Sequence, residues 1–268
     1  MLTWIIAHIL AVCVGVSLGL IGGGGSILAV PILVYVMGVP LKSAIAMSLV
    51  IVGAVSLIGI IPHWRQNHVN FKIAALFAPG AMLGAYIGAR FATLPIVTPT
   101  AQRILFVFVM FVAAYLMIHN SRHQSPANLE LDDSQNTADL ELSPRIQQNL
   151  RRWLAIPTEG LGVGMLTGMV GIGGGFMIIP TLVLLGNTPI KEAVGTSLVI
   201  MTFKSITGFA GYLGHIPIDI NLMLTFTLAA GLGMLLGAYL TRFMEARQLE
   251  TGFGYFVIAI ALFMLFKW

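Results

Sequence analysis

Two glycine clusters interrupt long apolar segments of the sequence at matching places. The first lies in the stretch GLIGGGGSILAVP at 19–31, and the second lies in GMVGIGGGFMIIP at 168–180. Glycine costs about 1 kcal/mol relative to alanine inside a helix, so each cluster predicts a broken helix. A helix that begins after such a break offers N–H groups without partners and the positive end of its dipole, both of which suit an anion. The predicted anion contacts are Gly22, Gly24, Gly25, Ser26, Gly171, Gly173, Gly174 and Gly175.

Close packing of helices through small residues is the alternative explanation for these glycines. Their density exceeds what packing needs, which favours a binding site. Matched breaks in two halves of a membrane chain are typical of transporter sites near the middle of the bilayer.

Polar side chains in the next apolar segment of each half are the second set of candidates. Lys204 lies in the middle of a predicted span, where an ionisable residue is costly. We expect it to attract an anionic substrate or to change protonation state during transport, with a side chain extended to the interface as the alternative. Hydroxyl groups in helices also commonly bond a carbonyl one turn back. The candidate contacts are Ser48, Thr196, Ser197 and Lys204, and the same spans carry Ser56 and Ser205.

Composition places these candidates in a membrane protein. Of the 268 residues, 57% are hydrophobic and 9% are charged, whereas a soluble domain carries about 25% charged residues. Eight apolar segments are separated by short polar stretches, and the first segment, 4–37, is long enough for two half-helices. The sequence therefore predicts an all-α polytopic protein in a lipid bilayer. The net charge of +4 reports membrane topology, and we expect no nucleic-acid partner.

The glycine clusters belong to a longer internal repeat with an offset of 149 residues. Residues 39–42 match 188–191, and residues 48–51 match 197–200. The predicted organisation is a first transmembrane repeat at 1–119, a polar, cytoplasmic connecting loop at 120–152, and a second repeat at 153–268. Within the loop we expect a flexible linker followed by a short amphipathic surface helix at 145–153.

The distribution of basic residues favours inverted repeats. If each glycine segment is a hairpin that returns to its starting side, four basic residues face nine others across the membrane. Basic residues favour the cytoplasmic face, so the central loop is predicted to be cytoplasmic and both termini external. Whether the hairpins are re-entrant or fully crossing stays open. The smaller set is Lys42, Arg90, Arg103 and Lys267, and the larger set is Arg65, Lys72, Arg122, Arg145, Arg151, Arg152, Lys191, Arg242 and Arg247.

The sequence contains no enzyme or metal-binding motif in the structural context that such a motif needs. Gly15-Val16-Ser17-Leu18-Gly19 matches the hydrolase pattern G-x-S-x-G, but an apolar span supplies neither the strand–turn–helix context nor triad partners. No Gly-Lys-Ser/Thr follows the clusters, and the histidines form no metal-binding set. We therefore expect no enzymatic activity, no cofactor and no metal site.

The doubled glycine segments, with VPLKSAIAMSLV at 39–50 and TPIKEAVGTSLV at 188–199, resemble the sulfite exporter TauE/SafE family of membrane transporters. The resemblance extends over 15–89 and 164–238. It implies a permease of the bacterial inner (plasma) membrane for small anions, often sulfur-containing ones such as sulfite or organosulfonates, with export driven by an ion gradient. The first repeat has Ala46-Met47-Ser48 where the second has Gly195-Thr196-Ser197, so the halves are expected to contribute unequally to the site.

The predicted function is that of a secondary transporter of small anions. The alternatives are an anion channel and a carrier of another small carboxylate or metabolite anion. The predicted partners are the anion, a coupling proton or sodium ion, and the lipid bilayer. The sequence leaves a homodimer open.

Overall fold

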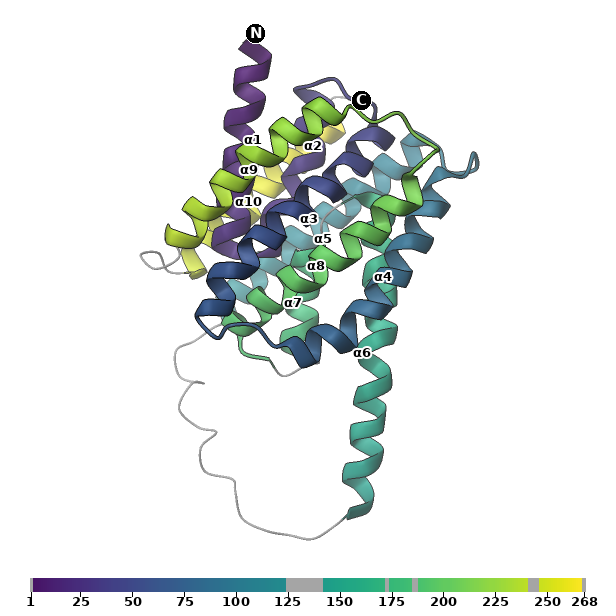
Figure 1. Ribbon diagram of the computed structural model, residues 1–268, viewed down its shortest axis with the longest axis vertical. Coiled ribbons are helices and arrows are strands. Elements are labelled where there is room, and N and C mark those ends of the chain that lie inside the picture. The colour runs from purple at the N-terminus through teal and green to yellow at the C-terminus, as the bar shows by residue number, and fades with distance from the viewer. Residues whose placement is uncertain (1, 124–141, 172–173, 185–187, 241–245, 267–268) are drawn as a thin grey trace.

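The computed structural model describes residues 2–123, 142–171, 174–184, 188–240 and 246–266, and over these ranges it is helical without strands (Figure 1). The helices in chain order are α1 (Leu2–Ile21), η1 (Gly23–Leu28, of the tighter 3₁₀ type), α2 (Ala29–Tyr35), α3 (Leu41–Arg65), α4 (Phe71–Thr93), α5 (Pro99–His123), α6 (Leu142–Val170), α7 (Gly175–Leu184), α8 (Ile190–Tyr212), α9 (Ile220–Leu240) and α10 (Ala246–Phe266).

Five of the described helices are long and apolar enough to cross a membrane by length and composition. They contain the windows Thr3–Leu20, Leu41–Arg65, Phe71–Thr93, Lys191–Tyr212 and Ile220–Leu240. Large apolar side chains also cover the outside of the bundle; Leu228 and Leu232 on α9 are 71% and 64% exposed. Such surfaces suit contact with lipid chains. The predicted multi-pass, all-α membrane fold is confirmed.

Both predicted helix breaks are present, and they fall at equivalent residues. Helix α1 ends directly before Gly22, and α6 ends directly before Gly171. Gly22 has φ 72° and Gly171 has φ 70°, a left-handed backbone that glycine adopts without the steric penalty of a side chain. The chain then continues as η1 and α2 in the first half and as α7 in the second.

The stretch between the repeats differs from the prediction. Helix α5 runs to His123 and α6 begins at Leu142, so helices enter both ends of the 120–152 stretch. The surface helix predicted at 145–153 is not separate, because it forms the first part of α6. No glycine cluster interrupts the sequence between Leu142 and the break, and α6 continues through Pro157. The predicted flexible linker at 124–141 lies outside the described residues.

The two repeats interlock through their glycine-lined helices. Helix α1 packs against α9, and α4 packs against α6. A side chain on Gly15 would overlap the carbonyl group of Ala230, and one on Gly164 would overlap that of Ala81. Because 15 corresponds to 164 and 81 to 230, equivalent helices make the same contact with the opposite repeat. The four-residue glycine spacing serves close helix packing.

Helices α3 and α8 cross at equivalent positions. Thr202 Oγ1 lies 3.5 Å from the Gly53 carbonyl oxygen, and these two residues are themselves 149 positions apart. Equivalent residues of the two halves therefore contact each other at this crossing. The crossing lies in the core, with Ile51, Val52 and Met201 all buried around it.

Gly164→Leu is expected to destabilise the protein, because its side chain would overlap the backbone of Ala81. Overfilling a tight contact costs about 1–3 kcal/mol, so thermal unfolding in detergent should occur several degrees lower. Gly162→Leu is the matched control, since Gly162 lies on the same helix with open space around it. Leucine favours helix over glycine, so this variant should unfold no earlier than the parent. Equal unfolding temperatures for the two variants would contradict the close α4–α6 contact.

Candidate functional site

The two helix breaks meet inside the molecule. A side chain on Gly23 would overlap the backbone of Gly175, and the reverse is also true. A Cβ on Gly22 would lie 2.7 Å from Val194 Cγ1, and one on Gly171 would lie 2.8 Å from Ile45 Cα. Ile45 and Val194 are equivalent residues of the two repeats. Gly22 therefore lies against α8 and Gly171 lies against α3, the long helices of the opposite halves, and glycine allows this approach.

Lys204 lies beside the second break. Its side chain is fully buried in the middle of α8, and Nζ donates a hydrogen bond to Thr167 Oγ1 at 2.7 Å. Nζ also occupies the place that a Cβ on Gly174 would take. Lys204 thus contacts the last turns of α6 and the start of α7, and its side chain does not extend to the interface.

Thr167 is oriented to receive the lysine. Its hydroxyl donates to the carbonyl of Val163 at 2.8 Å, with the Gly164 carbonyl at 3.1 Å as a second acceptor. A hydroxyl has one hydrogen and two lone pairs, so the oxygen is left to accept from Lys204.

The amine of Lys204 has spare donors and no counter-charge among the residues that the structure describes. An ammonium group has three N–H donors, and within those residues the hydrogen-bonded acceptor of Nζ is Thr167 Oγ1. The carbonyl of Gly174, the residue directly before α7, accepts from the Met177 and Ile178 backbone N–H groups at 3.0 Å. In its ammonium form, Lys204 therefore faces the positive end of a helix dipole, an arrangement that an anion would stabilise.

The first repeat has no copy of this lysine–threonine pair. Val55 stands at the position equivalent to Lys204, and Leu18 stands at the position equivalent to Thr167. Both apolar residues are buried. Sequence reasoning identified Lys204 but missed Thr167. The signal that could have found it is this paired replacement of two apolar residues by two polar ones between repeats.

Three of the other predicted contacts also lie at the breaks. Ser48 Oγ lies 2.6 Å from the carbonyl oxygen of Gly171 and 2.7 Å from that of Ile45, and its one hydrogen can be donated to either, so it joins α3 to the second break. Ser26 donates to the Gly23 carbonyl at 2.7 Å within its own turn. Gly25 packs against the Ser17–Leu18 backbone of α1, where a side chain would clash.

Of the four remaining predicted contacts, Thr196 and Ser197 form hydrogen bonds to other backbone groups, and the other two are glycines. Thr196 Oγ1 accepts from the backbone N–H of Asn70 at 2.9 Å, in the connection between α3 and α4. Ser197 donates to the Val194 carbonyl at 2.7 Å, one turn back in its own helix. Gly24 lies within η1, and Gly173 lies outside the described residues. The structure thus brings together Lys204, Gly174, Gly175 and Gly171, with Ser48 attached.

The end of α6 is held by two residues that sequence reasoning missed. The hydroxyl of Tyr212 donates to the Gly168 carbonyl at 2.9 Å, and Gln102 Nε2 donates to the Met169 carbonyl at 2.7 Å. The last carbonyl groups of a helix have no partners within it, so these bonds fix the backbone directly before the break. Tyr212 and Gln102 come from α8 and α5, far from Gly168 in the sequence, and no motif marks them.

The sequence is similar to those of known membrane transporter proteins. The sequence profile described as "Sulfite exporter TauE/SafE" matches residues 7–264. The chain is 33% identical over 262 residues to a "Probable membrane transporter protein" of Xylella fastidiosa (strain 9a5c), covering 95% of this chain and 92% of that protein. It is 23% identical over 252 residues to "Probable membrane transporter protein YdhB" of Bacillus subtilis (strain 168), covering 94% and 96% of the two chains.

No solved structure matches this chain. The matched profile spans nearly all of the sequence and includes both glycine breaks, Lys204 and Thr167. The chain therefore belongs to the TauE/SafE sulfite exporter family of membrane transporters.

Proposed function

We propose that this transporter moves small anions by a secondary, ion-gradient-driven mechanism, and that the anion binds at Lys204, Thr167 and the start of α7. The observation that carries the proposal is the buried amine of Lys204 beside the N-terminus of α7, without a carboxylate partner among the described residues. A buried positive group is costly unless it is compensated. A transported anion supplies that compensation.

We infer that the substrate is a sulfur-containing oxyanion such as sulfite or an organosulfonate. Its several oxygen atoms can accept hydrogen bonds from Lys204 Nζ and from backbone N–H groups at the start of α7 together. The profile that matches this chain is described as a sulfite exporter. The names of the relatives state no substrate.

Movement of the two repeats against each other would expose the site alternately to the two sides. The close approach of Gly23 and Gly175 supports this, since two backbones without side chains can slide or separate with little obstruction. A proton or a sodium ion would supply the gradient.

Inverted repeats in the inner membrane are the topology that we favour. In Figure 1, α1 runs downward from the N-terminus and its equivalent, α6, runs upward from Leu142. Both ends of the chain lie at the top of the view, and α6 begins at the bottom. These directions support external termini, a cytoplasmic connection at 120–152, and repeats at 1–119 and 153–268. Whether two copies pair in the membrane does not enter the proposal.

Reporter fusions test this topology. Alkaline phosphatase should be active when it is fused at either end of the chain, and green fluorescent protein should be fluorescent when it is inserted in the 124–141 stretch. The reason is that α1 and α6 run in opposite directions through the bundle. A connection and termini that report the same side would rule out the inverted arrangement.

Transport itself is tested in proteoliposomes. We expect saturable uptake of labelled sulfite, sulfoacetate or thiosulfate that depends on an imposed pH or sodium gradient. Protein-free liposomes are the control. Flux that does not saturate would indicate a channel. Uptake of none of the three anions by folded protein would contradict the sulfur-anion assignment and leave carboxylates and other metabolite anions as substrates.

A further inference from the structure

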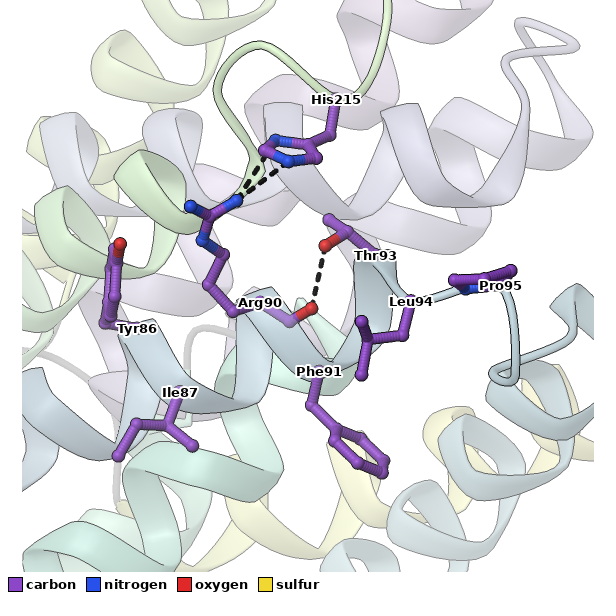
Figure 2. A pocket seen from close by; sticks show the side chains of 8 residues that line it. All are labelled: Tyr86, Ile87, Arg90, Phe91, Thr93, Leu94, Pro95 and His215. Atoms are coloured by element: carbon purple, nitrogen blue, oxygen red, sulfur yellow. Dashed lines mark hydrogen bonds between the residues drawn. The ribbon is translucent and has the colours of Figure 1, made fainter.

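A pocket of about 550 Å³ opens at the end of α4, and no residue of either glycine break lines it (Figure 2). All but one of its lining residues come from the last two turns of α4 and the chain directly after it, and the last comes from the connection between α8 and α9. The lining residues are Tyr86, Ile87, Arg90, Phe91, Thr93, Leu94, Pro95 and His215. The pocket therefore joins a helix of the first repeat to a connection of the second.

Arg90 is held in a defined direction at this pocket. His215 Nδ1 lies 2.8 Å from the Leu213 carbonyl, so it is the ring nitrogen that carries the hydrogen in the neutral imidazole. His215 Nε2 then accepts from Arg90 Nη1 at 2.8 Å. Figure 2 shows the guanidinium group pointing toward the imidazole ring. A guanidinium has five N–H donors, so this bond leaves most of them for a ligand.

The charge of Arg90 is not neutralised by the residues that the structure describes. No carboxylate within those ranges pairs with Arg90, and the side chain is exposed. Arg90 lies in the last turn of the apolar span that ends at Thr93. Basic residues at this depth sit at the level of the lipid headgroups.

The walls of the pocket below Arg90 are apolar and open to the outside. Ile87 and Phe91 lie one turn apart on α4, and Leu94 follows the end of the helix. The three side chains are 46%, 44% and 43% exposed. In Figure 2, Ile87 and Phe91 point away from the side of α4 on which Arg90 meets His215. The pocket thus has a cationic end and an apolar end. A small free anion would use only the first, whereas a phospholipid would use both.

The residues equivalent to Arg90 and His215 in the internal repeat are not an arginine and a histidine. Tyr239 stands at the position equivalent to Arg90, and Gln66 stands at the position equivalent to His215. The cation and the imidazole therefore occur at one end of the bundle only, which is expected if they serve one membrane leaflet.

We propose that this pocket binds an anionic phospholipid, with its phosphate on Arg90 and an acyl chain against Ile87, Phe91 and Leu94. The lipid would tie the end of α4 to the α8–α9 connection. This site is separate from the proposed transport site and does not depend on it.

The experiment measures lipid binding to the whole protein in a neutral detergent by native mass spectrometry. Phosphatidylglycerol is titrated against phosphatidylcholine with the same acyl chains. We expect the parent protein to bind phosphatidylglycerol preferentially, and Arg90→Gln to weaken that binding on the order of five-fold. Arg65→Gln is the matched control, because Arg65 is also an exposed arginine in the last turn of a helix. It should change binding by less than about two-fold.

A second variant keeps the test informative if Arg90→Gln does not fold. Leu94→Glu places a carboxylate in the exposed wall, just after α4 ends, and should expel phosphatidylglycerol by charge repulsion without disturbing the core. Glycerol 3-phosphate supplies the headgroup alone and should not displace the lipid. Unchanged lipid binding in Arg90→Gln or Leu94→Glu, or an equal loss in Arg65→Gln, would overturn the proposal. Displacement by glycerol 3-phosphate would instead indicate a site for free anions.

Discussion

Lys204→Met should abolish most anion transport while leaving the protein at least as stable as the parent. A hydrogen bond to a charged group contributes about 1.5–3 kcal/mol, so loss of the amine should weaken anion binding about ten- to a hundred-fold. Methionine has similar length and fills the same buried space in α8. It removes a buried amine that has one hydrogen-bond acceptor among the described residues, and apolar replacement of such groups is often neutral or stabilising. Uptake into proteoliposomes and thermal unfolding are measured on the same preparation.

The combination of the two measurements distinguishes a binding role from a structural one. If Lys204 served only to hold α8 against α6, Lys204→Met would lose stability together with transport. Lys191→Met is the control for charge, because Lys191 is an exposed lysine in the first turn of the same helix. We expect its transport to be unchanged. Full transport by Lys204→Met would remove this residue from the site.

Gly174→Ala should also stop transport, by filling the place of the lysine amine. The added methyl group would clash with Nζ of Lys204 and approach Thr167 Cγ2 to 2.6 Å. Lys204 is flexible at its far end and would move aside, so the fold should survive. The backbone at Gly174 has φ 74°, where a side chain costs about 1–2 kcal/mol. We therefore expect a small loss of stability and a large loss of uptake.

Gly214→Ala is the control that has the backbone strain of Gly174→Ala without its steric clash. Gly214 has φ 77° and no atom within 4 Å of an added Cβ, so alanine there carries the same backbone strain without contacting anything. Its stability should fall by a similar amount, and its transport should persist. If both variants transported equally well, the space beside Gly174 would not belong to the anion site.

The positions of the helix breaks could be predicted from the sequence because they depend on a local property. A backbone with φ near 70° excludes most side chains, so Gly22 and Gly171 mark the breaks directly. Lys204 could be predicted for a similar reason, since one charged residue in an apolar span needs an explanation by itself. Amino-acid composition alone was enough to predict a membrane protein.

The partners of these residues depend on contacts between repeats, which no local pattern encodes. Thr167 was missed because a single threonine in an apolar helix usually bonds its own backbone, and Thr167 does so as well as accepting from Lys204. Tyr212 and Gln102 meet the end of α6 only after three helices have packed. Thr196 was expected near the anion, but its hydroxyl accepts from the N–H of Asn70, since the direction of a side chain on α8 follows from the crossing with neighbouring helices.

The packing of each glycine-lined helix against the opposite repeat has a consequence for biogenesis. Helix α1 finds its close contact on α9, and α4 finds its contact on α6. When synthesis has reached only the end of the first repeat, the partner helices of α1 and α4 do not yet exist. The glycine faces of α1 and α4 then remain exposed to lipid. The first half therefore cannot mature alone, and a nascent chain stalled before α9 would be a substrate for membrane quality control. By the same reasoning, an ancestor with a single repeat could have acquired this packing only by pairing with a second copy of itself before the gene was duplicated.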